Sequence, residues 1–308
     1  MLDVSIVIVN WNTRDLLQQC LRAIVETAGR IEYEIIVIDN GSTDGSVEMV
    51  RDCFPSVRLI VNSTDVGFAR ANNQAIQVSR GQHVLLLNSD TIVRPRALKA
   101  LVRFMNMHLE VGIVGGQLLN GDGTLQPSWA KFPTVWSELM GKNIRARRIY
   151  PTRDGSLAYA VDWVGGACLL IRRAAFEQVG LLDEGFFMYS EEADWCFRVK
   201  QLGWAVCYCP EAQVVHLGGQ SSQHARARMK AELYRSKLLF FYKHYGSGQA
   251  LLLGLLLQCI FFLKATAGRM LWLISLKHAT AGESLHQNSR ALIRTISKAL
   301  NEHRLGST

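Results

Sequence analysis

The first hundred residues alternate short β-branched runs with segments of helical spacing, and this alternation constrains the fold more than any other feature of the chain. The β-branched runs cover residues 4–9, 34–38, 57–61 and 83–87. After the first run, residues 12–27 place their apolar side chains on one helical face, with Thr13 as a candidate N-cap. Strands that alternate with helices predict a parallel sheet with right-handed crossovers. We therefore expect an α/β domain.

The first strand–helix turn, VNWNTRD, contains no glycine. It therefore lacks the G-x-G-x-x-G of a dinucleotide-binding fold, and the chain has no P-loop motif G-x-x-x-x-G-K-[ST] either. The net charge of +8 nevertheless favours anionic partners, such as nucleotide phosphates or an acidic membrane face. Nucleic acid is disfavoured, because the basic runs at 142–148 and 224–230 are short and are not interleaved with stacking aromatics.

Polar residues stand where several predicted strands end. The stretch LLLNSD closes the fourth run on Asp90, at the sheet edge where open α/β folds bind ligands; a helix cap is the alternative. Asp39 closes the second run and can accept hydrogen bonds from a nucleoside; a turn aspartate is the equal alternative. His216 ends a later run in VVHLGGQSS. It is a ligand only if Asp90 meets it across space, and otherwise a structural histidine.

The stretch DVGFARANNQA has the features of a helix start that faces a phosphate. Gly67 permits a close backbone approach, and Arg70 could face a diphosphate. Asn72 and Asn73 are unfavourable inside a helix unless their amides have partners. An ordinary exposed helix start is the alternative interpretation.

The stretch FFMYSEEADWCFR places three carboxylates, Glu191, Glu192 and Asp194, in the first turn of a predicted helix. The helix dipole favours acids at this position, so the cluster also has a purely structural explanation. The aromatic residues before the helix would raise a carboxylate pKa, whereas Arg198 and the helix amino terminus would lower it. A general base needs such a balance, which makes this cluster the candidate catalytic group.

In this order the motifs resemble the family 2 glycosyltransferases, and most of all their bacterial rhamnosyltransferase-like branch. The matching stretches are VSIVIVNWN, VIDNGSTDGS, VGFARANN, LLLNSD, GGACLLIRR, GLLDEGFFMYSEEADWCFR and HLGGQSS, within residues 3–245. The resemblance implies a GT-A fold, an α/β architecture in which a Rossmann-like nucleotide-binding sheet is continuous with an acceptor-binding region. It also implies a nucleotide-sugar donor, Mg²⁺ or Mn²⁺ as cofactor, and inversion at the anomeric carbon.

The resemblance also assigns roles to single residues. Asp39 resembles the acid that reads the nucleobase or ribose, His216 resembles the histidine that closes the metal and diphosphate site, and Glu192 resembles the catalytic base. The full expected site comprises Glu191, Glu192 and Asp194 for catalysis, Asp39, Gly67, Arg70, Asn73, Asn88 and Asp90 for the donor, Trp163, Gly165, Gly166 and Ala167 for the acceptor, and Asp90 and His216 for the metal.

Two residues depart from the family pattern. Asn88 stands where the D-x-D motif has its first acid, so Asp90 is the one direct carboxylate. A single carboxylate suits Mg²⁺, which keeps several waters when bound to proteins. Glu192 stands where the pattern usually has aspartate, so the base reaches one methylene further.

A leucine-rich segment near the carboxyl end predicts contact with a membrane. Residues 250–263 are uncharged and, as a helix, span about 21 Å, whereas a bilayer core is about 30 Å thick. Extension to residue 276 includes Lys264 and Arg269, so a simple transmembrane span is disfavoured. We expect a helix, or a helical pair, in the membrane interface, with Lys264, Arg269 and Lys277 at anionic headgroups. A core helix or an oligomer interface is the alternative.

The sequence thus predicts two regions, a glycosyltransferase domain over 1–245 and a membrane-associating helical region over 246–308. No signal peptide is visible and the seven cysteines include no C-x-x-C, which favours a cytoplasmic protein at the inner face of the plasma membrane. We expect transfer of a sugar, rhamnose first, from a dTDP- or UDP-sugar to a glycan or polyprenyl-linked acceptor of a bacterial cell-surface polysaccharide. A homo-oligomer is compatible with this. The alternatives are a non-catalytic, nucleotide-sugar-binding membrane adaptor and a nucleotidyltransferase.

Overall fold

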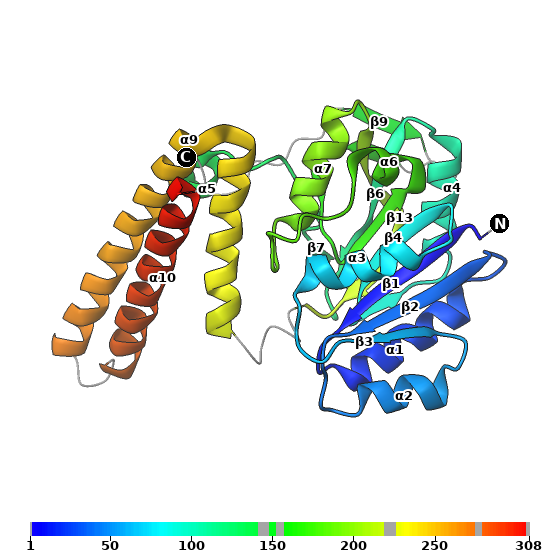
Figure 1. The fold of residues 1–308 in the computed structure, drawn as a ribbon, viewed down its shortest axis with the longest axis horizontal. Coiled ribbons are helices and arrows are strands. Elements are labelled where there is room, and N and C mark those ends of the chain that lie inside the picture. The colour runs from blue at the N-terminus through cyan, green and yellow to red at the C-terminus, as the bar shows by residue number, and fades with distance from the viewer. Residues whose placement is uncertain (1, 141–147, 152–156, 219–225, 275–278, 306–308) are drawn as a thin grey trace. The chain divides into compact units, whose positions relative to one another are not determined.

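The structure is a computed structural model that describes residues 2–140, 148–151, 157–218, 226–274 and 279–305 (Figure 1). Lys277 and residues 142–147 of the first basic run lie outside the described residues. The chain divides into two compact units. The first unit comprises residues 1–133, 140–187 and 191–224, and the second comprises residues 134–139, 188–190 and 225–308.

The amino-terminal half of the first unit is a parallel α/β sheet, as the sequence predicts. Its strands are β1 (Val4–Asn10), β2 (Tyr33–Asp39), β3 (Arg58–Val61) and β4 (His83–Asn88), in the order β3-β2-β1-β4. Every neighbouring pair in this series is parallel. The connecting helices are α1 (Arg14–Thr27), α2 (Ser46–Cys53) and α3 (Phe68–Val78). All four expected strands are therefore confirmed, and their ends differ from the prediction by at most one residue.

The same sheet continues into the second half of this unit. β12 (Cys168–Arg172) pairs antiparallel with β4 and with β6 (Val111–Leu119), and β13 (Ala205–His216) pairs parallel with β6. The sheet ends with β10 (Leu157–Ala160) and β9 (Arg148–Pro151), while β5 (Thr91–Val93) pairs with β13 and β7 (Leu125–Gln126) pairs with β6. A sheet that is continuous between the two halves is what the expected GT-A fold requires.

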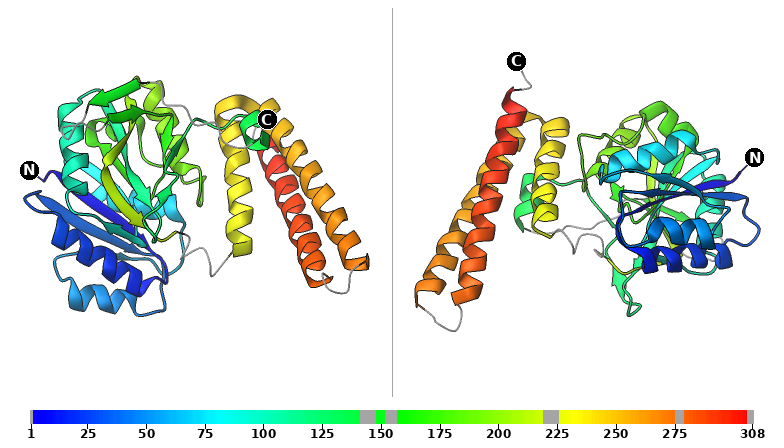
Figure 2. Two further views of the ribbon diagram at one scale, coloured as in Figure 1. Left: turned by 180° about the vertical axis from the view of Figure 1, so that it is seen from behind. Right: turned by 60° about the horizontal axis from the view of Figure 1, so that its bottom comes forward.

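Helices cover both faces of the sheet, which explains the uninterrupted apolar runs of its strands. The first face packs with α1, α2 and α4 (Ala97–Met107), and the second with α3, α6 (Arg173–Val179) and α7 (Glu191–Gln201) (Figures 1 and 2). In β4, Leu85 and Leu87 belong to the first core and Leu86 to the second. Three successive leucines are thus buried because the two cores share one strand.

Two local details settle alternatives that the sequence leaves open. Asp90 is followed by β5, and α4 begins only at Ala97, so the helix-cap interpretation of Asp90 is wrong. Thr13 does precede α1, but its hydroxyl donates to Asn10 Oδ1 (2.7 Å) and makes no capping bond. Neither side chain is used as a helix cap, and both remain at the carboxyl ends of strands.

The second unit is helical. α9 (Arg226–Ile274) bends at Gly246, whose φ of 85° and ψ of 169° lie outside the helical range, and α10 (Ala279–Leu305) runs back along it (Figure 2). Gln258 donates to Ser297 Oγ (2.8 Å), and His286 Nδ1 pairs with the Ala265 carbonyl (2.9 Å), so the helices are antiparallel. The buried apolar side chains of the pair include Leu253, Leu257, Phe261, Leu292 and Ile296. The expected helical pair is therefore present.

The helical unit begins earlier in the chain than the predicted boundary at residue 246. α9 starts at Arg226, and the kink at Gly246 is the feature that falls at the expected boundary. A composition change marks residue 246, whereas the backbone continues as helix on both sides of it. The stretch Ala227–Met270 is long and apolar enough, by length and composition alone, to cross a membrane, although a third of its most apolar part is buried.

Two short segments from the amino-terminal side of α9 also belong to the helical unit. α5 (Val135–Met140) joins it through an ion pair between Glu138 and Lys237. The turn at 188–190 joins it through the Ser236 hydroxyl, which donates to the Met188 carbonyl (2.8 Å). The helical unit is therefore not separable at residue 246 by a simple truncation.

Candidate active site

Polar side chains from three strands gather at one edge of the sheet of the first unit. β2 ends at Asp39, β4 ends at Asn88 and β13 ends at His216. These ends lie on the same side because β2 and β13 both run in the direction of β4, as the chain of pairings shows. The β5–β13 ladder sets Thr91 directly opposite His216. The end of a late strand is thereby placed against the residues that follow β4.

His216, Asn88 and Asp90 form the centre of this edge. His216 Nε2 lies 3.3 Å from Asp90 Oδ1 and 3.3 Å from Asn88 Nδ2, while Nδ1 lies 2.6 Å from Gln126 Oε1. The Asp90 carbonyl accepts the Leu217 amide (3.0 Å), which fixes the two chain segments against each other. Asp90 is buried. The fold thus brings together the carboxylate and the imidazole that the sequence suggests as partners.

This donor set fits a divalent cation that takes most of its ligands from elsewhere. Adjacent ligands of an octahedral ion with bonds of about 2.1 Å are about 3 Å apart, and Asp90 Oδ1 and His216 Nε2 are 3.3 Å apart. Among the described residues, no group of three or more histidine, cysteine, aspartate or glutamate side chains could hold a metal. One carboxylate and one imidazole leave most positions to water and phosphate oxygens, which suits Mg²⁺ or Mn²⁺.

Asp39 is buried at the end of β2 and holds the turn that follows it. Its Oδ2 accepts from Asn10 Nδ2 (2.8 Å), and its Oδ1 accepts from the Ser42 amide (2.8 Å). The turn interpretation is therefore realised. Each carboxylate oxygen retains a second lone pair, so this geometry is compatible with a nucleoside contact, and donor binding by Asp39 stays a prediction.

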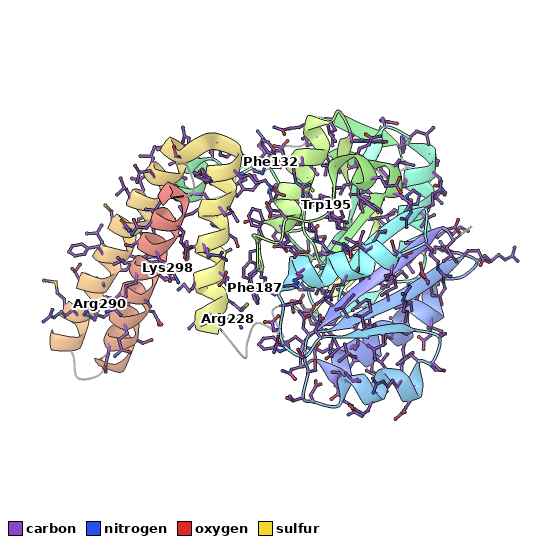
Figure 3. The ribbon with its side chains drawn as sticks, in the orientation of Figure 1. Phe132, Phe187, Trp195, Arg228, Arg290 and Lys298 are labelled. Atoms are coloured by element: carbon purple, nitrogen blue, oxygen red, sulfur yellow. The ribbon has the colours of Figure 1, made fainter. Side chains whose placement is uncertain are left out.

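Gly67 allows the close approach that the sequence suggests, and in this structure the approaching group is protein backbone. Its φ is +88°, and a Cβ there would lie 2.7 Å from the carbonyl oxygen of Phe187, which is labelled in Figure 3. The same carbonyl accepts the Phe68 amide (2.7 Å). Gly67 therefore lets the segment that leads to α7 dock on the start of α3.

Asn73 and Arg70 hold the same segment. Asn73 donates to the Leu182 carbonyl (2.9 Å) and accepts the Leu182 amide (3.0 Å). Arg70 is 63% exposed and lies 3.9 Å from the Glu184 carboxylate. The partner that a buried asparagine needs is thus Leu182, and donor binding by Arg70 and Asn73 stays a prediction.

Glu191 and Glu192 open α7 as a coupled pair of carboxyl groups. Burial, followed by the charge of Glu192, raises the pKa of the Glu191 carboxyl well above its usual value of 4.5. A hydrogen bond also joins the two side chains. In such a pair the more buried group takes the proton and the less buried group keeps the charge. Glu192 is only partly buried, and its role as the catalytic base stays a prediction.

Asp194, the third acid of the predicted catalytic cluster, lies in a structural ion pair. Its carboxylate is fully buried, and Oδ2 accepts from Arg198 Nε (2.8 Å). Arg198 also donates to the carbonyls of Val179 and Leu181, at 2.8 Å each. This network fastens α7 to the end of α6 and the segment after it, and a catalytic role for Asp194 stays a prediction.

The segment expected to meet the acceptor connects the Asp90–His216 edge with the paired glutamates. The Ala167 carbonyl accepts the Asn88 amide (3.2 Å). A Cβ placed on Gly166 would lie 3.8 Å from Cβ of Glu192. Ala167 thus contacts the Asp90–His216 edge, and its neighbour Gly166 lies beside Glu192.

Trp163 and Gly165 hold the other end of this stretch. Trp163 lies in β11 (Trp163–Val164), which pairs antiparallel with β8 (Trp129–Ala130), and its Nε1 donates to the Lys131 carbonyl (2.9 Å). The Gly165 amide donates to the Ser128 carbonyl (2.8 Å). The small β8–β11 sheet therefore holds the amino-terminal end of the stretch in place. Acceptor binding by these residues stays a prediction.

Three residues of the site are absent from the sequence prediction: Asn10, Ser42 and Gln126. Asn10 ends a buried strand as Asp39 does, so the same argument could have found it. Gln126 lies in a two-residue strand after a glycine-containing turn, and nothing in such a pattern indicates a functional glutamine. Its relevance becomes visible only when the fold brings His216, at the end of β13, within 2.6 Å of its Oε1.

Comparison with known proteins places these features in a family. The family model described as "Glycosyl transferase family 2" matches residues 5–180. An N-acetylglucosaminyl-diphospho-decaprenol L-rhamnosyltransferase of Mycobacterium tuberculosis is 29% identical over 227 residues, which cover 67% of this chain and 73% of that protein. Rhamnosyltransferase WbbL of Escherichia coli is 27% identical over 226 residues, which cover 69% of this chain and 83% of that protein.

Solved structures show the same fold at lower identity. The mannosyltransferase PcManGT from Pyrobaculum calidifontis, in complex with GDP-Man and Mn²⁺, matches with a TM-score of 0.57 and 16% identity over 98% of this chain and 86% of that chain. GalNAc-T7 with UDP, GalNAc and Mn²⁺ matches with a TM-score of 0.57 and 20% identity over 70% of this chain and 44% of that chain. The expected glycosyltransferase architecture is therefore confirmed.

Proposed function

Because the chain belongs to glycosyl transferase family 2, we propose that it is an inverting glycosyltransferase that moves a sugar from a nucleotide-sugar donor to a lipid-linked glycan. The observation that carries this proposal is the stretch at Gly166 and Ala167. Ala167 contacts Asn88 beside the Asp90–His216 pair, and Gly166 faces Glu192. A diphosphate bound at the first site and an acceptor hydroxyl at the second would meet along this stretch.

The donor and acceptor classes are suggested by relatives. Two proteins similar to this chain are named rhamnosyltransferases, so dTDP-rhamnose is the first donor to test and UDP-sugars are the next. One of the two names N-acetylglucosaminyl-diphospho-decaprenol as its substrate, which supports a polyprenyl-linked acceptor here. The proposed process is synthesis of a bacterial cell-surface polysaccharide.

Asp90 and His216 are the residues that would hold Mg²⁺ or Mn²⁺. When bound, the cation supplies positive charge against the leaving nucleoside diphosphate. Asn88 Nδ2 lies 3.3 Å from His216 Nε2 and provides a neutral donor at the same edge. The net charge of +8 further favours an anionic donor.

Glu192 is the general base of the proposed reaction. It removes the proton from the acceptor hydroxyl while the oxygen attacks the anomeric carbon from the face opposite the diphosphate, so configuration inverts. Burial and the charge of Glu192 raise the pKa of the Glu191 carboxyl, so a proton shared by the pair favours Glu191 and leaves Glu192 as the acceptor. Because the departing diphosphate needs no proton from the protein, one carboxylate base suffices for this chemistry.

An exposed apolar stripe on α9 supports association with a membrane. The α9 apolar stripe comprises Leu252, Leu255, Phe262, Leu263 and Met270, which are 47–65% exposed. Successive members are three, seven, one and seven residues apart, which keeps them on one helical face, opposite the side chains buried against α10. Lys264 and Arg269 are also exposed and are suited to anionic headgroups. We place the protein at the cytoplasmic membrane surface, where a lipid-linked acceptor resides.

The experiment that tests the proposed function is a donor panel. The full-length protein is incubated with dTDP- and UDP-sugars, with and without Mg²⁺ or Mn²⁺ and a polyprenyl-linked acceptor, and release of nucleoside diphosphate is measured. The proposal predicts metal-dependent release from one donor class that rises when the acceptor is present. A non-catalytic adaptor would bind a donor without releasing diphosphate, and a nucleotidyltransferase would release pyrophosphate from a nucleoside triphosphate.

A further inference from the structure

Gln126 contacts His216 from the side of the ring that faces away from Asp90. Its Oε1 lies 2.6 Å from His216 Nδ1, and its Nε2 donates to the His216 backbone carbonyl (3.3 Å) and to Asn120 Oδ1 (3.0 Å). The amide of Gln126 therefore uses both N–H groups and its oxygen.

The direction of these hydrogen bonds is fixed by groups that can only accept. The His216 carbonyl is one of them, so the Nε2 of Gln126 must face it. The Asp122 carboxylate is the other, because it accepts the Thr124 hydroxyl (2.6 Å), which in turn accepts Asn120 Nδ2 (2.9 Å). Asn120 then presents its Oδ1 to Gln126, as observed. Both ends of the network require Oε1 of Gln126 to face His216 Nδ1.

An amide oxygen facing Nδ1 requires that this nitrogen carry a hydrogen. In a neutral imidazole the other nitrogen, Nε2, then carries the lone pair. Asn88 Nδ2, which can only donate, lies 3.3 Å from Nε2 and agrees with this assignment. The lone pair of Nε2 and the carboxylate oxygen of Asp90, 3.3 Å apart, are then two electron-pair donors that face each other.

We propose that Gln126 is a positioning residue that holds His216 as the Nδ1–H tautomer, so that Nε2 and Asp90 Oδ1 together can bind a divalent cation. The inference deepens the proposed function and rests on it, because it takes Asp90 and His216 as ligands of the same ion. Partners of this kind orient the ligand ring and increase its basicity. Gln126, which lies in β7 directly after the glycine-containing β6–β7 turn, thus belongs to the active site without contacting a substrate.

The test compares substitutions that remove or keep the acceptor at Nδ1. Gln126→Leu removes it, whereas Gln126→Glu keeps an oxygen that accepts from Nδ1–H. Leu125→Ala is the matched control, because Leu125 is the neighbouring residue of the same strand and is 68% exposed. The Mn²⁺ affinity of the detergent-solubilised full chain is measured with dTDP and, separately, with UDP.

We expect Gln126→Leu to weaken Mn²⁺ binding by about 10- to 100-fold, while Gln126→Glu and Leu125→Ala stay within about threefold of the unchanged protein. A second readout needs no metal. In ¹⁵N-histidine NMR spectra at pH 8, where an ordinary imidazole is neutral, His216 should be the Nδ1–H tautomer. The signal is assigned by its loss in His216→Ala.

Three results would overturn the inference: an Nε2–H tautomer at His216, wild-type Mn²⁺ affinity in Gln126→Leu, or an equal loss of affinity in Gln126→Leu and Gln126→Glu. The last result would mean that Gln126 only holds the turn in place. If the unchanged protein turns over its donor with metal and one of these results appears, this inference alone fails. If the unchanged protein neither binds Mn²⁺ nor releases nucleoside diphosphate, the proposed function fails with it.

Discussion

His216 Nε2 lies 3.3 Å from Asp90 Oδ1, although the two residues are far apart in the sequence. The β5–β13 ladder, in which Thr91 pairs with His216, sets this distance. The hydrogen bond from the Leu217 amide to the Asp90 carbonyl also holds the two chain segments at this distance. Because backbone pairing holds both residues, the pair is preorganised before any ligand arrives, which is the arrangement a charged transition state requires.

The paired glutamates of α7 should differ sharply in their effect on the rate. Glu192→Gln removes the proton acceptor and should lower kcat by about 10²- to 10⁴-fold with little change in donor affinity. Glu191→Gln puts an uncharged side chain of the same shape in place of the carboxyl group whose pKa is raised, so it should leave kcat within about tenfold of the unchanged enzyme. Steady-state kinetics of the two variants provide the comparison. A larger loss in Glu191→Gln than in Glu192→Gln would exchange the two assignments.

The buried Glu191 should also make folding stability depend on pH. Its pKa is raised in the folded state from the usual 4.5, so the folded protein binds a proton that the unfolded chain releases. The associated stability is fully present below the usual pKa and is lost as the pH rises towards the folded pKa. We expect Glu191→Gln to flatten this decline and to be the more stable protein at neutral pH. Denaturant titrations between about pH 5 and pH 8 measure it, and an unchanged slope would contradict it.

A side chain at Gly67 should destabilise the protein by steric overlap, and a comparison with Gly203 separates this overlap from backbone strain. Gly67 and Gly203 share a φ of +88°, but a Cβ at Gly67 would lie 2.7 Å from the Phe187 carbonyl oxygen, whereas nothing lies within 4 Å of one at Gly203. Gly203→Ala should therefore cost only backbone strain, about 1 kcal/mol. Gly67→Ala should cost about 2–4 kcal/mol and lower kcat, because it displaces the segment that leads to Glu192.

Denaturant unfolding of both glycine variants measures the difference directly. Equal destabilisation of Gly67→Ala and Gly203→Ala would show that Phe187 does not dock on α3 in solution. A loss of stability in Gly67→Ala without any loss of turnover would separate the docking of this segment from catalysis.

The α9 apolar stripe should hold the protein at anionic lipid. A triple variant, Leu255→Ser, Phe262→Ser and Leu263→Ser, removes exposed apolar surface worth about 1.5–3 kcal/mol per side chain when buried. It should abolish cosedimentation with vesicles that contain anionic lipid and leave donor hydrolysis intact. Leu109→Ser, at a residue that is 71% exposed in the first unit, is the matched control and should change neither property.

Vesicle binding should also weaken at high salt if Lys264 and Arg269 contact headgroups. If only detergent, and not high salt, releases even the triple variant from the membrane, α9 spans the bilayer. A protein that is soluble without detergent and ignores vesicles would assign the stripe to a protein interface. Point variants are preferable to truncation after Tyr245, because α5 and the 188–190 turn pack in the same unit as the residues removed.

The parallel half of the fold follows from the sequence because its strands β1, β2 and β4 are largely buried on both faces. Leu85, Leu86 and Leu87 illustrate the signal, since a run without alternation has few interpretations other than a covered strand. The strand ends then identify Asp39 and Asp90. The contact of Asp90 with His216 could be proposed from their chemistry, but only the β5–β13 ladder demonstrates it.

Other features could not be predicted because the sequence does not show what a polar side chain meets. Asn73 required a partner inside its helix, and that partner is the backbone of Leu182, far along the chain. Asp194 carried the same acidic signal as Glu192, and only the structure shows that its carboxylate forms an ion pair with Arg198. Gln126 gave no signal at all, because its relevance depends on a hairpin and a distant strand.

The Asp90–His216 pair should support metal-dependent transfer of a sugar with inversion at its anomeric carbon. The most direct measurement is an NMR determination of the anomeric configuration of the product formed from the active donor, for the unchanged protein and for Asp90→Ala, with Mn²⁺ and with chelator. We expect a product whose configuration is opposite to that of the donor, formed only with the metal, and a loss of turnover on the order of 10²-fold or more in Asp90→Ala. A product that retains the donor configuration, or full turnover in chelator, would contradict it.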